Sequence, residues 1–269
     1  MLKDITLGQY FPGNSVAHRL DPRTKLILEI LYIVALFSAN DWFVSYAFLA
    51  LVLGSAIAVS HVPLKSLVRG LKPVVIIVCF TGVINLFWTP GDTVLFSWWI
   101  FTINLEGVYR AFFMVIRIVM LIMGTFLLTY TTSPITLTDG LETLLGPLKK
   151  LHLPIHELSM MMSIALRFIP TLIEETDKIM SAQKARGADF ESGSVLQRAK
   201  AMVPLLVPLF ISAFRRADEL AVAMECRCYH GGEGRTKLRV LRYQGIDYAA
   251  FALAIVVLAV IYTLRFLNV

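Results

Sequence analysis

Two arginines in the second half of the chain, Arg186 and Arg227, stand in matched settings that suggest side chains presented for docking. Each follows an aspartate by nine residues and an alanine by four, and the two sets are 41 residues apart: Asp177, Ala182 and Arg186, then Asp218, Ala223 and Arg227. Positions nine apart lie on opposite faces of a helix, so neither aspartate is the intrahelical partner of its arginine. A guanidinium stays charged, and its planar fork can hold a carboxylate through two hydrogen bonds.

The surroundings of the two arginines favour docking over a purely structural role. A single basic residue at a helix end is explained by the partial negative charge of the C-terminal carbonyls, an interaction that contributes about 0.3–1 kcal/mol. Here two arginines end two helices, and small residues flank both: Ala185 and Gly187 around Arg186, Cys226 and Cys228 around Arg227. We interpret both arginine side chains as docking contacts of the same kind, each presented at the end of its own helix.

Three helices are predicted in residues 133–245, a segment too long for an ordinary loop and too apolar for a disordered linker. The first runs from Thr138 to Lys150, and the second begins after Pro154 and ends at Arg186, where Gly187 stops it. The third runs from about Ser194 to Arg227, because the glycines that follow break the chain.

The two long helices are apolar in their first halves and charged in their last turns, and Pro170, Pro204 and Pro208 should kink them. We expect them to lie along the inner membrane face, with the apolar starts against the membrane spans and the polar ends in the cytosol. A re-entrant or membrane-surface hairpin is the alternative, although neither apolar part resembles a twenty-residue span.

The composition places the chain in a membrane. Of its 269 residues 57% are hydrophobic and 16% charged, and the mean hydropathy is +0.70, whereas soluble domains have roughly 25% charged residues. Five apolar runs are predicted to span the bilayer: 26–39, 43–60, 74–88, 111–130 and 248–264. Three cysteines cannot form a disulfide framework, and the N-terminus lacks the pattern of a signal peptide.

The basic residues orient these spans. Of 25 lysines and arginines, 22 fall before the first span, between the second and third, or between residues 133 and 242. The connections 40–42 and 89–106 contain none, and all four tryptophans lie at or in them. Positive residues mark the cytosolic side and tryptophan favours the interface, so the N-terminus is predicted to be cytoplasmic and the C-terminus external.

At the arginines the sequence resembles the transmembrane T component of energy-coupling factor (ECF) transporters, membrane scaffolds of micronutrient importers. Ala185-Arg186-Gly187 matches the first of two Ala-Arg-Gly motifs that end the family's coupling helices. Cys226-Arg227-Cys228 occupies the second position, with cysteines in place of alanine and glycine, and Cys228 loses the freedom of glycine at positive φ. The segment from His18 to Lys25 (HRLDPRTK) extends the resemblance over essentially the whole chain.

The resemblance implies a non-catalytic subunit of an ATP-driven importer of a vitamin or a metal, in the plasma membrane of a bacterium or an archaeon. Arg186 and Arg227 would insert into grooves on two ABC ATPases, and a substrate-binding S component would pack on the apolar helix face, where Met160, Met161 and Met162 offer an adaptable surface. No phosphate-binding G-x-x-x-x-G-K-[ST] loop occurs, so nucleotide hydrolysis is expected in a partner. No cofactor, resident metal or nucleic-acid partner is expected.

Other readings are less well supported. His156-Glu157 starts a zinc-protease motif but lacks its second histidine, and the cysteines at 226 and 228 with His230 are too crowded for a convincing zinc site. Arg117, inside the fourth span, is expected to form a buried pair with Glu29 or Asn85 rather than to line a transport path. A conventional ABC permease or a secondary transporter that binds solute itself remains the alternative function.

The expected fold is therefore all-α and polytopic, with about five transmembrane helices and a cytosolic coupling region of about three amphipathic helices. The predicted domains are transmembrane helices 1–4 in residues 1–132, a cytosolic coupling domain in 133–245 and a C-terminal transmembrane helix in 246–269.

Overall fold

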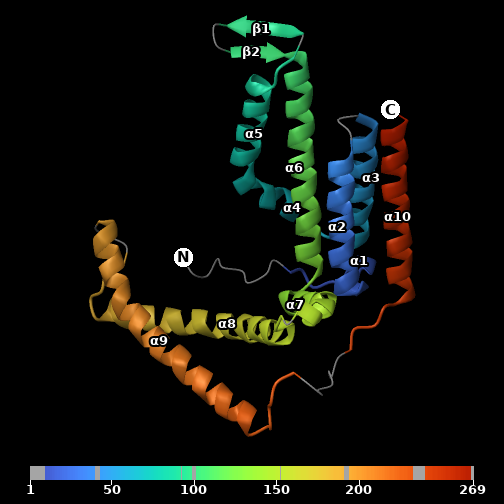
Figure 1. Cartoon of the computed structure of the whole chain (residues 1–269). Coiled ribbons are helices and arrows are strands. Elements are labelled where there is room, and N and C mark those ends of the chain that lie inside the picture. The colour runs from blue at the N-terminus through green and yellow to red at the C-terminus, as the bar shows by residue number, and fades with distance from the viewer. Residues whose placement is uncertain are drawn as a thin grey trace. The chain divides into compact units, whose positions relative to one another are not determined.

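The computed structural model describes residues 10–39, 43–91, 93–98, 101–151, 153–190, 194–232 and 240–267, and these are helical apart from one hairpin (Figure 1). The elements in order are α1 (Val16–Arg19), α2 (Pro22–Ser38), α3 (Phe43–Ser60), α4 (Leu64–Leu71), the 3₁₀ turn η2 (Lys72–Val74), α5 (Val75–Trp88), β1 (Val94–Trp98), β2 (Phe101–Asn104), α6 (Leu105–Thr131), α7 (Pro134–Leu145), the 3₁₀ helix η3 (Gly146–Leu151), α8 (Ile155–Ala185), α9 (Val195–Glu225) and α10 (Gly245–Phe266).

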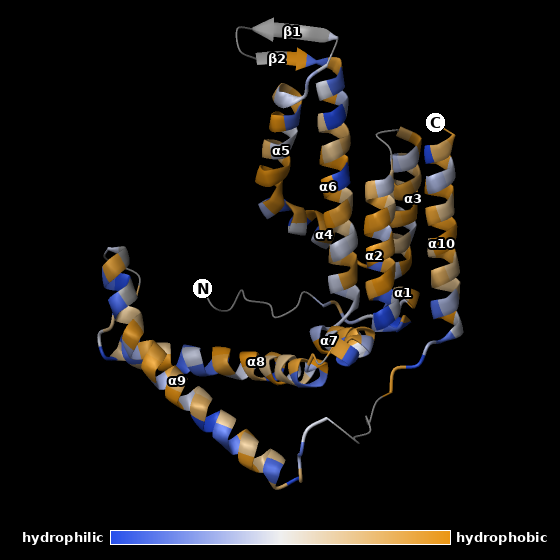
Figure 2. Ribbon diagram, in the orientation of Figure 1, coloured by the Kyte–Doolittle hydropathy of each residue, from blue (hydrophilic) through white to orange (hydrophobic). Residues whose placement is uncertain are grey.

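The chain divides into two compact units. The bundle unit comprises Gly8–Leu144 and Leu241–Val269, and the α8/α9 unit comprises Leu145–Val240. Hydrophobic residues predominate along α3, α5 and α10, whereas α8 and α9 carry hydrophilic residues along much of their length (Figure 2). The predicted domain boundaries at 132/133 and 245/246 stay a prediction.

The core of the bundle unit lies where α2, α3, α6 and α10 meet. Leu36 of α2, Leu49 of α3 and Ile261 of α10 are completely buried, and the ring of Tyr46 stacks on that of Phe113 with centroids 5.2 Å apart. Many large apolar side chains of these helices are exposed instead, among them Ile30, Phe37, Leu51 and Phe266. That pattern suits a bundle whose surroundings are hydrocarbon, because lipid-facing positions have no reason to be polar.

Five helices in the described part of the chain are long and apolar enough to cross a membrane: Phe43–Ser60, Leu64–Trp88, Leu105–Thr131, Leu196–Glu225 and Gly245–Phe266. The prediction of an all-α polytopic protein with about five such helices is confirmed. The membership differs from the prediction in two respects. α2, which holds the predicted first span, has only 17 residues, the lower end of the length that crosses a bilayer. α9 qualifies by length and composition, although we predicted that its apolar part would be too short.

A β-hairpin that the sequence analysis did not predict follows α5. β1 and β2 pair antiparallel, with Trp98 opposite Phe101 and Val94 opposite Asn104, and an irregularity between Val94 and Phe96 shifts the register. The Asn104 side chain donates from Nδ2 to the Thr89 carbonyl at 3.1 Å, which ties the base of the hairpin to the end of α5. The hairpin thus joins α5 to α6, the two helices that pack most extensively against each other.

The contact between α5 and α6 depends on a glycine at the start of α6. A Cβ placed on Gly107 would lie 2.9 Å from the Leu86 backbone oxygen of α5, closer than a side-chain carbon normally approaches. Because the obstacle is backbone, it cannot rotate away. Close approach of backbones at small residues is a common way to pack helices in a membrane, where the hydrophobic effect adds little.

Arg117 of α6 does not have the predicted partners. Its Nε donates to the Tyr46 hydroxyl at 2.7 Å, and its guanidinium lies 5.8 Å from the Phe37 and Tyr46 ring centroids. Glu29 instead accepts from the Thr125 hydroxyl at 3.0 Å, and Asn85 donates to a carbonyl one turn earlier in its own helix. Arg117 is therefore held within the bundle by Tyr46 and Phe37, and not by the predicted Glu29 or Asn85.

The helices predicted after residue 133 are present. α8 and α9 end within two residues of the predicted ends at Arg186 and Arg227. The start of α7 was predicted wrongly: it begins at Pro134, four residues before Thr138. Proline suits the first helical turn, and the Ser133 hydroxyl accepts a hydrogen bond from the Thr136 backbone N–H at 3.3 Å, so the cap lies earlier than the acidic residues suggested.

Candidate functional site

The C-terminus of α8 closes in a Schellman motif around Arg186. The backbone N–H of Ala188 donates to the carbonyl of Gln183 at 3.0 Å, and that of Gly187 donates to the carbonyl of Lys184 at 3.0 Å. These two bonds define the motif, in which the residue after the C-cap takes a left-handed conformation. Gly187 is that residue, with φ +88°, so Arg186 is the C-cap.

The C-terminus of α9 closes in the same way around Arg227. The backbone N–H of Tyr229 donates to the carbonyl of Met224 at 3.0 Å, and that of Cys228 donates to the carbonyl of Glu225 at 2.9 Å. Cys228 has φ +55°. Arg227 is thus in the C-cap position that Arg186 has in α8, and the predicted departure at Cys228 changes the residue without changing the turn.

Both arginines are exposed, and so are the residues on either side of them. Within the described part of the chain, neither guanidinium makes a hydrogen bond or an ion pair. The backbone of each arginine is fixed by the Schellman bonds, while the side chain remains available to bind a partner. The two arginines therefore have the same backbone geometry, as their matched spacing in the sequence predicts.

We predict opposite effects of two substitutions at the left-handed positions. Cys228→Gly should stabilise the α9 end by about 0.5–1 kcal/mol, because glycine removes the penalty that a Cβ incurs at positive φ. Gly187→Ala should destabilise the α8 end by about 1 kcal/mol, since a Cβ there has open space but an unfavourable φ. Thermal unfolding of the two purified variants in detergent measures both. Equal shifts of the same sign would contradict a shared left-handed turn.

A polar cluster of Glu175, Ser212 and Arg216, which we call the Glu175 pin, joins the two long helices. Glu175 of α8 accepts a hydrogen bond on Oε1 from the Ser212 hydroxyl, and one on Oε2 from Arg216 Nη2 at 3.0 Å. Both donors come from α9 (Figure 1). The Ser212 hydrogen bond, followed by the neighbouring Arg216 guanidinium, holds the pKa of Glu175 below its ordinary value. The cluster is therefore ionised, and hence intact, at neutral pH.

The pin lies eleven residues before Arg186 along α8 and eleven residues before Arg227 along α9. A second contact, from Gln183 Nε2 to the Pro204 carbonyl at 3.4 Å, shows that the helices run antiparallel through the crossing. Because the helices run antiparallel, Arg186 and Arg227 lie on opposite sides of the pin. Figure 1 also shows a bend in α9, for which the two prolines inside this helix provide a cause.

The outer face of α9 is apolar and uncovered by the described residues of the α8/α9 unit. Leu205 is buried, but a stripe of large side chains at helical spacing is half or more exposed: Val203, Val207, Phe210 and Phe214. On α8, Met161 and Met162 are about half exposed, and Met160 is partly buried. The three methionines therefore do not share one environment, and the exposed apolar stripe on α9 is the larger surface.

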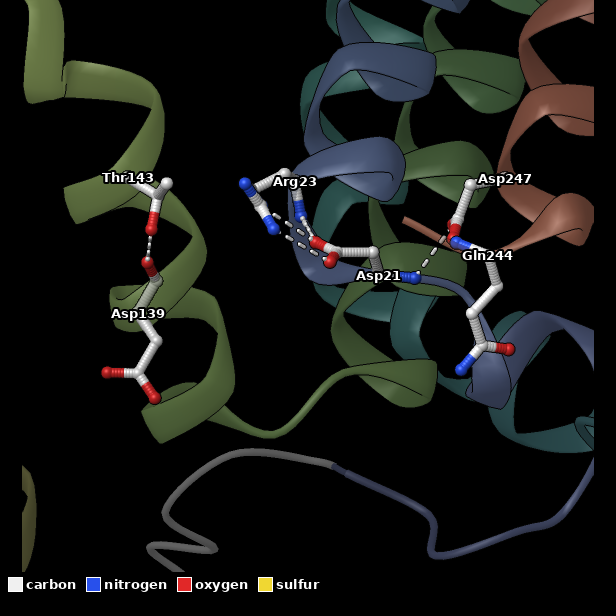
Figure 3. A network of polar contacts seen from close by, with 6 residues as sticks. All are labelled: Asp21, Arg23, Asp139, Thr143, Gln244 and Asp247. Atoms are coloured by element: carbon white, nitrogen blue, oxygen red, sulfur yellow. Dashed lines mark hydrogen bonds and ion pairs between the residues drawn. The ribbon is translucent and has the colours of Figure 1, made fainter. Parts of the chain in front are cut away.

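A second group of polar contacts lies in the bundle unit, where residues of the HRLDPRTK segment join the start of α2 to the start of α10 (Figure 3). Asp21 caps α2: its carboxylate accepts from the Arg23 backbone N–H at 2.9 Å and from two guanidinium nitrogens of Arg23 at 3.2 Å. The Arg23 guanidinium lies 4.5 Å from the centroid of the Tyr243 ring, just before α10. Asp247, in the first turn of α10, accepts from the Asp21 backbone N–H at 2.9 Å and from that of Gln244 at 2.7 Å.

Lys25 extends this group to the end of α6. Its Nζ donates to the Thr131 carbonyl at 2.9 Å and to the Thr132 hydroxyl at 3.1 Å, and the lysine is 8% exposed. The last carbonyls of a helix have no intrahelical partner, and a buried cation is well placed to satisfy one of them. Sequence reasoning treated this segment only as part of a resemblance, because its partners lie more than 100 residues away.

Among the described residues no cluster of three or more histidine, cysteine or acidic side chains could hold a metal ion. Cys226 and Cys228 are exposed free thiols. His156 packs instead against Gly232, where an added Cβ would lie 2.3 Å from the imidazole ring. The segment that follows Arg227 thus returns to the first turn of α8.

Comparison with known proteins agrees with the resemblance. The family model described as "CbiQ: Cobalt transport protein" matches residues 13–238. The chain is similar to proteins named "Energy-coupling factor transporter transmembrane protein EcfT" from several bacteria. It is 58% identical to that of Thermosediminibacter oceani over 93% of this chain and 94% of the relative. For Acidaminococcus fermentans the identity is 53% over 100% and 98%, and for Bacillus subtilis it is 52% over 98% and 100%. The chain therefore belongs to the CbiQ/EcfT family of transmembrane components of energy-coupling factor transporters.

Proposed function

We propose that the chain is the membrane scaffold of an ATP-driven micronutrient importer, in which Arg186 and Arg227 each dock one ABC ATPase. The observation that supports this most directly is the identical Schellman geometry around the two arginines. A pair of exposed guanidinium groups on rigid backbone, free of internal partners in the described residues, suits capture of a carboxylate by two hydrogen bonds. The flanking residues Ala185, Gly187, Cys226 and Cys228 are small enough to let a groove close around each arginine.

Two separate ATPases fit the arrangement better than one. Each arginine lies eleven residues beyond the pin on its own helix, which is about 16 Å of helix at 1.5 Å per residue. The two helices are antiparallel, so the two arginines lie in opposite directions from the pin. A single groove cannot hold two arginines that are presented by different helix ends, so we assign one ATPase to each, and ATP hydrolysis to these partners.

The substrate-binding S component is proposed to pack on the exposed apolar surface of α8 and α9. This surface consists of the stripe on α9 and the methionines on α8, and exposing it to water is unfavourable. Its members are Val203, Val207, Phe210 and Phe214, and the half-exposed Met161 and Met162 with Met160 beside them. Thioether side chains adapt to different partners. The transported vitamin or metal would then be bound by the S component rather than by this chain.

The charge distribution supports the proposed placement in the plasma membrane. Twenty-two of the 25 basic residues lie on the face that we assign to the cytosol, together with the N-terminus and the arginine ends. The hairpin β1–β2, in a connection without lysine or arginine, is assigned to the outside.

A self-contained transporter is the second candidate, and one observation favours it. The bundle unit contains a cavity of about 330 Å³ with an almost wholly apolar lining, which also includes the basic residue Lys25 and the acidic residue Glu29. A solute with an apolar body could enter such a space. Lys25 Nζ is already held by the end of α6, however, which leaves one carboxylate to recognise the solute.

Reconstitution separates the two candidates. We expect the purified chain in liposomes to show no ATP hydrolysis and no solute uptake, and both activities to appear when two ABC ATPases and an S component of a relative's transporter are added. Uptake by the chain alone, reduced by Glu29→Gln, would favour the self-contained transporter and contradict the scaffold.

A further inference from the structure

The two segments through which the bundle unit connects to the α8/α9 unit are both held by the same short segment. The outgoing segment runs from the end of α6, at Thr131 and Thr132, through α7 to the boundary of the unit after Leu144, and the returning segment leads into the start of α10 at Gln244. Lys25 bonds the first, and Asp21 is bonded through Asp247 to the second. Nothing in the local sequence brings these points together, because Asp21 and Asp247 are 226 positions apart.

We propose that Asp21, Lys25 and Asp247 form a clamp that carries movement of both connections into the bundle, and that they are thereby positioning residues for energy coupling. The inference rests on the proposed function, since it presumes that ATPases move the α8/α9 unit. It adds the place at which that movement enters the bundle.

The outgoing arm of the clamp is a buried, charge-assisted contact. Lys25 Nζ reaches the Thr131 carbonyl and the Thr132 hydroxyl, and both of these residues are buried. A cation in a dry environment holds its acceptors tightly, because water cannot replace them. The end of α6 therefore cannot move away from α2 without breaking this contact.

The returning arm is a buried carboxylate shared between two helix starts. Asp247 is 1% exposed, and its two oxygens accept from the Asp21 N–H at the start of α2 and the Gln244 N–H at the start of α10. Both donors are backbone groups, so their positions are those of the helices themselves. Figure 3 shows the Asp247 carboxylate between the two chain segments.

A third contact adds α7, the last helix of the bundle unit before the chain enters the α8/α9 unit. A Cβ on Gly140 of α7 would lie 3.1 Å from Pro22 Cβ and 3.3 Å from the Arg23 backbone nitrogen. α7 thus packs directly on the first turn of α2. Together the contacts join the start of α2 to the end of α6, to α7 and to the start of α10, so that none of these can shift without breaking a contact.

The proposal predicts uncoupling rather than loss of assembly. In the reconstituted full complex, Lys25→Met and Asp247→Asn should retain both ATPases and hydrolyse ATP, while solute taken up per ATP falls at least about tenfold. Methionine keeps the length of the lysine stem without its donors, and asparagine keeps the shape of the carboxylate while one of its two acceptors becomes a donor. Lys25→Arg should recover much of the coupling, because a guanidinium can donate to the same carbonyl and hydroxyl.

Matched controls come from the same unit. Lys65→Met removes an exposed lysine of α4, and Asp139→Asn alters a carboxylate of α7 that points away from the network in Figure 3; both should couple as the wild type does. A wild-type ratio of uptake to hydrolysis in the Lys25 and Asp247 variants would overturn the clamp and leave the proposed function intact. Failure of both variants to accumulate in the membrane would assign these residues to stability alone, which also overturns the clamp. Absence of ATP-dependent uptake by the wild-type complex would refute both.

Discussion

Replacing both Arg186 and Arg227 with alanine is expected to abolish co-purification of the ATPases and ATP-dependent uptake, while the chain remains folded in the membrane. Loss of one partner of a desolvated charge pair costs roughly 2–5 kcal/mol, and about 1.4 kcal/mol corresponds to a tenfold change in affinity. Each single substitution should therefore weaken docking about 30-fold or more. The double variant should fall below the affinity needed to survive purification, because neither site remains to hold the second ATPase nearby.

The lysine variants distinguish docking from a dipole effect. If each arginine only stabilised its helix end, Arg186→Lys and Arg227→Lys would be nearly silent, since a cation remains and the interaction is below about 1 kcal/mol. A guanidinium that holds a carboxylate cannot be replaced by an ammonium without losing the fork, so we expect only partial recovery. Arg198→Ala, an exposed arginine in the first turn of α9, is the control. Full ATPase retention and wild-type uptake in the double alanine variant would refute the docking role.

Of two glycine-to-alanine substitutions in the bundle unit, only one is expected to destabilise the protein. Gly107→Ala should destabilise the bundle by about 1–3 kcal/mol, since the new methyl group meets the Leu86 carbonyl oxygen at 2.9 Å and forces α5 away from α6. Gly54→Ala should be neutral or stabilise by up to about 1 kcal/mol, because nothing lies within 4 Å of its added Cβ and alanine is the better helix former.

Thermal unfolding of the two variants in the same detergent measures the difference. A shift of several degrees downward for Gly107→Ala, with no downward shift for Gly54→Ala, is the expected result. A harmless Gly107→Ala would mean that α5 and α6 do not approach at this residue.

The sequence predicted the long elements of the fold well where local signals mark their ends. Pro154 and Gly187 bracket α8, and Ser194 starts α9 with a capping box, so both helices were placed within about two residues. The β-hairpin was not predicted, because the absence of lysine and arginine from its connection indicates only the side of the membrane on which it lies. The prolines and the charged second half of α9 favoured a helix too short in apolar length to span the membrane, yet its apolar part is long enough for a span.

Much of the candidate site was also accessible from the sequence, but its supports were not. Spacing alone identified Arg186 and Arg227 as equivalent. The substitution of cysteine for glycine at position 228 was also recognisable in the sequence, and Cys228 does adopt a positive φ. The pin at Glu175 and the Asp21–Asp247 contact join residues that are 37 to 226 positions apart. No periodicity or motif reports such contacts, because they arise only when helices have packed.

The Glu175 pin gives the two arginine ends equal lever arms. Arg186 follows Glu175 by eleven residues along α8, and Arg227 follows Arg216 by eleven residues along α9, which is about 16 Å of helix in each case. For a given rotation about this pivot, the two ends travel the same distance and deliver the same force. Two motors that act on the two arginines would therefore experience equal loads, and the scaffold is mechanically suited to a pair of ATPases that work through strokes of the same length.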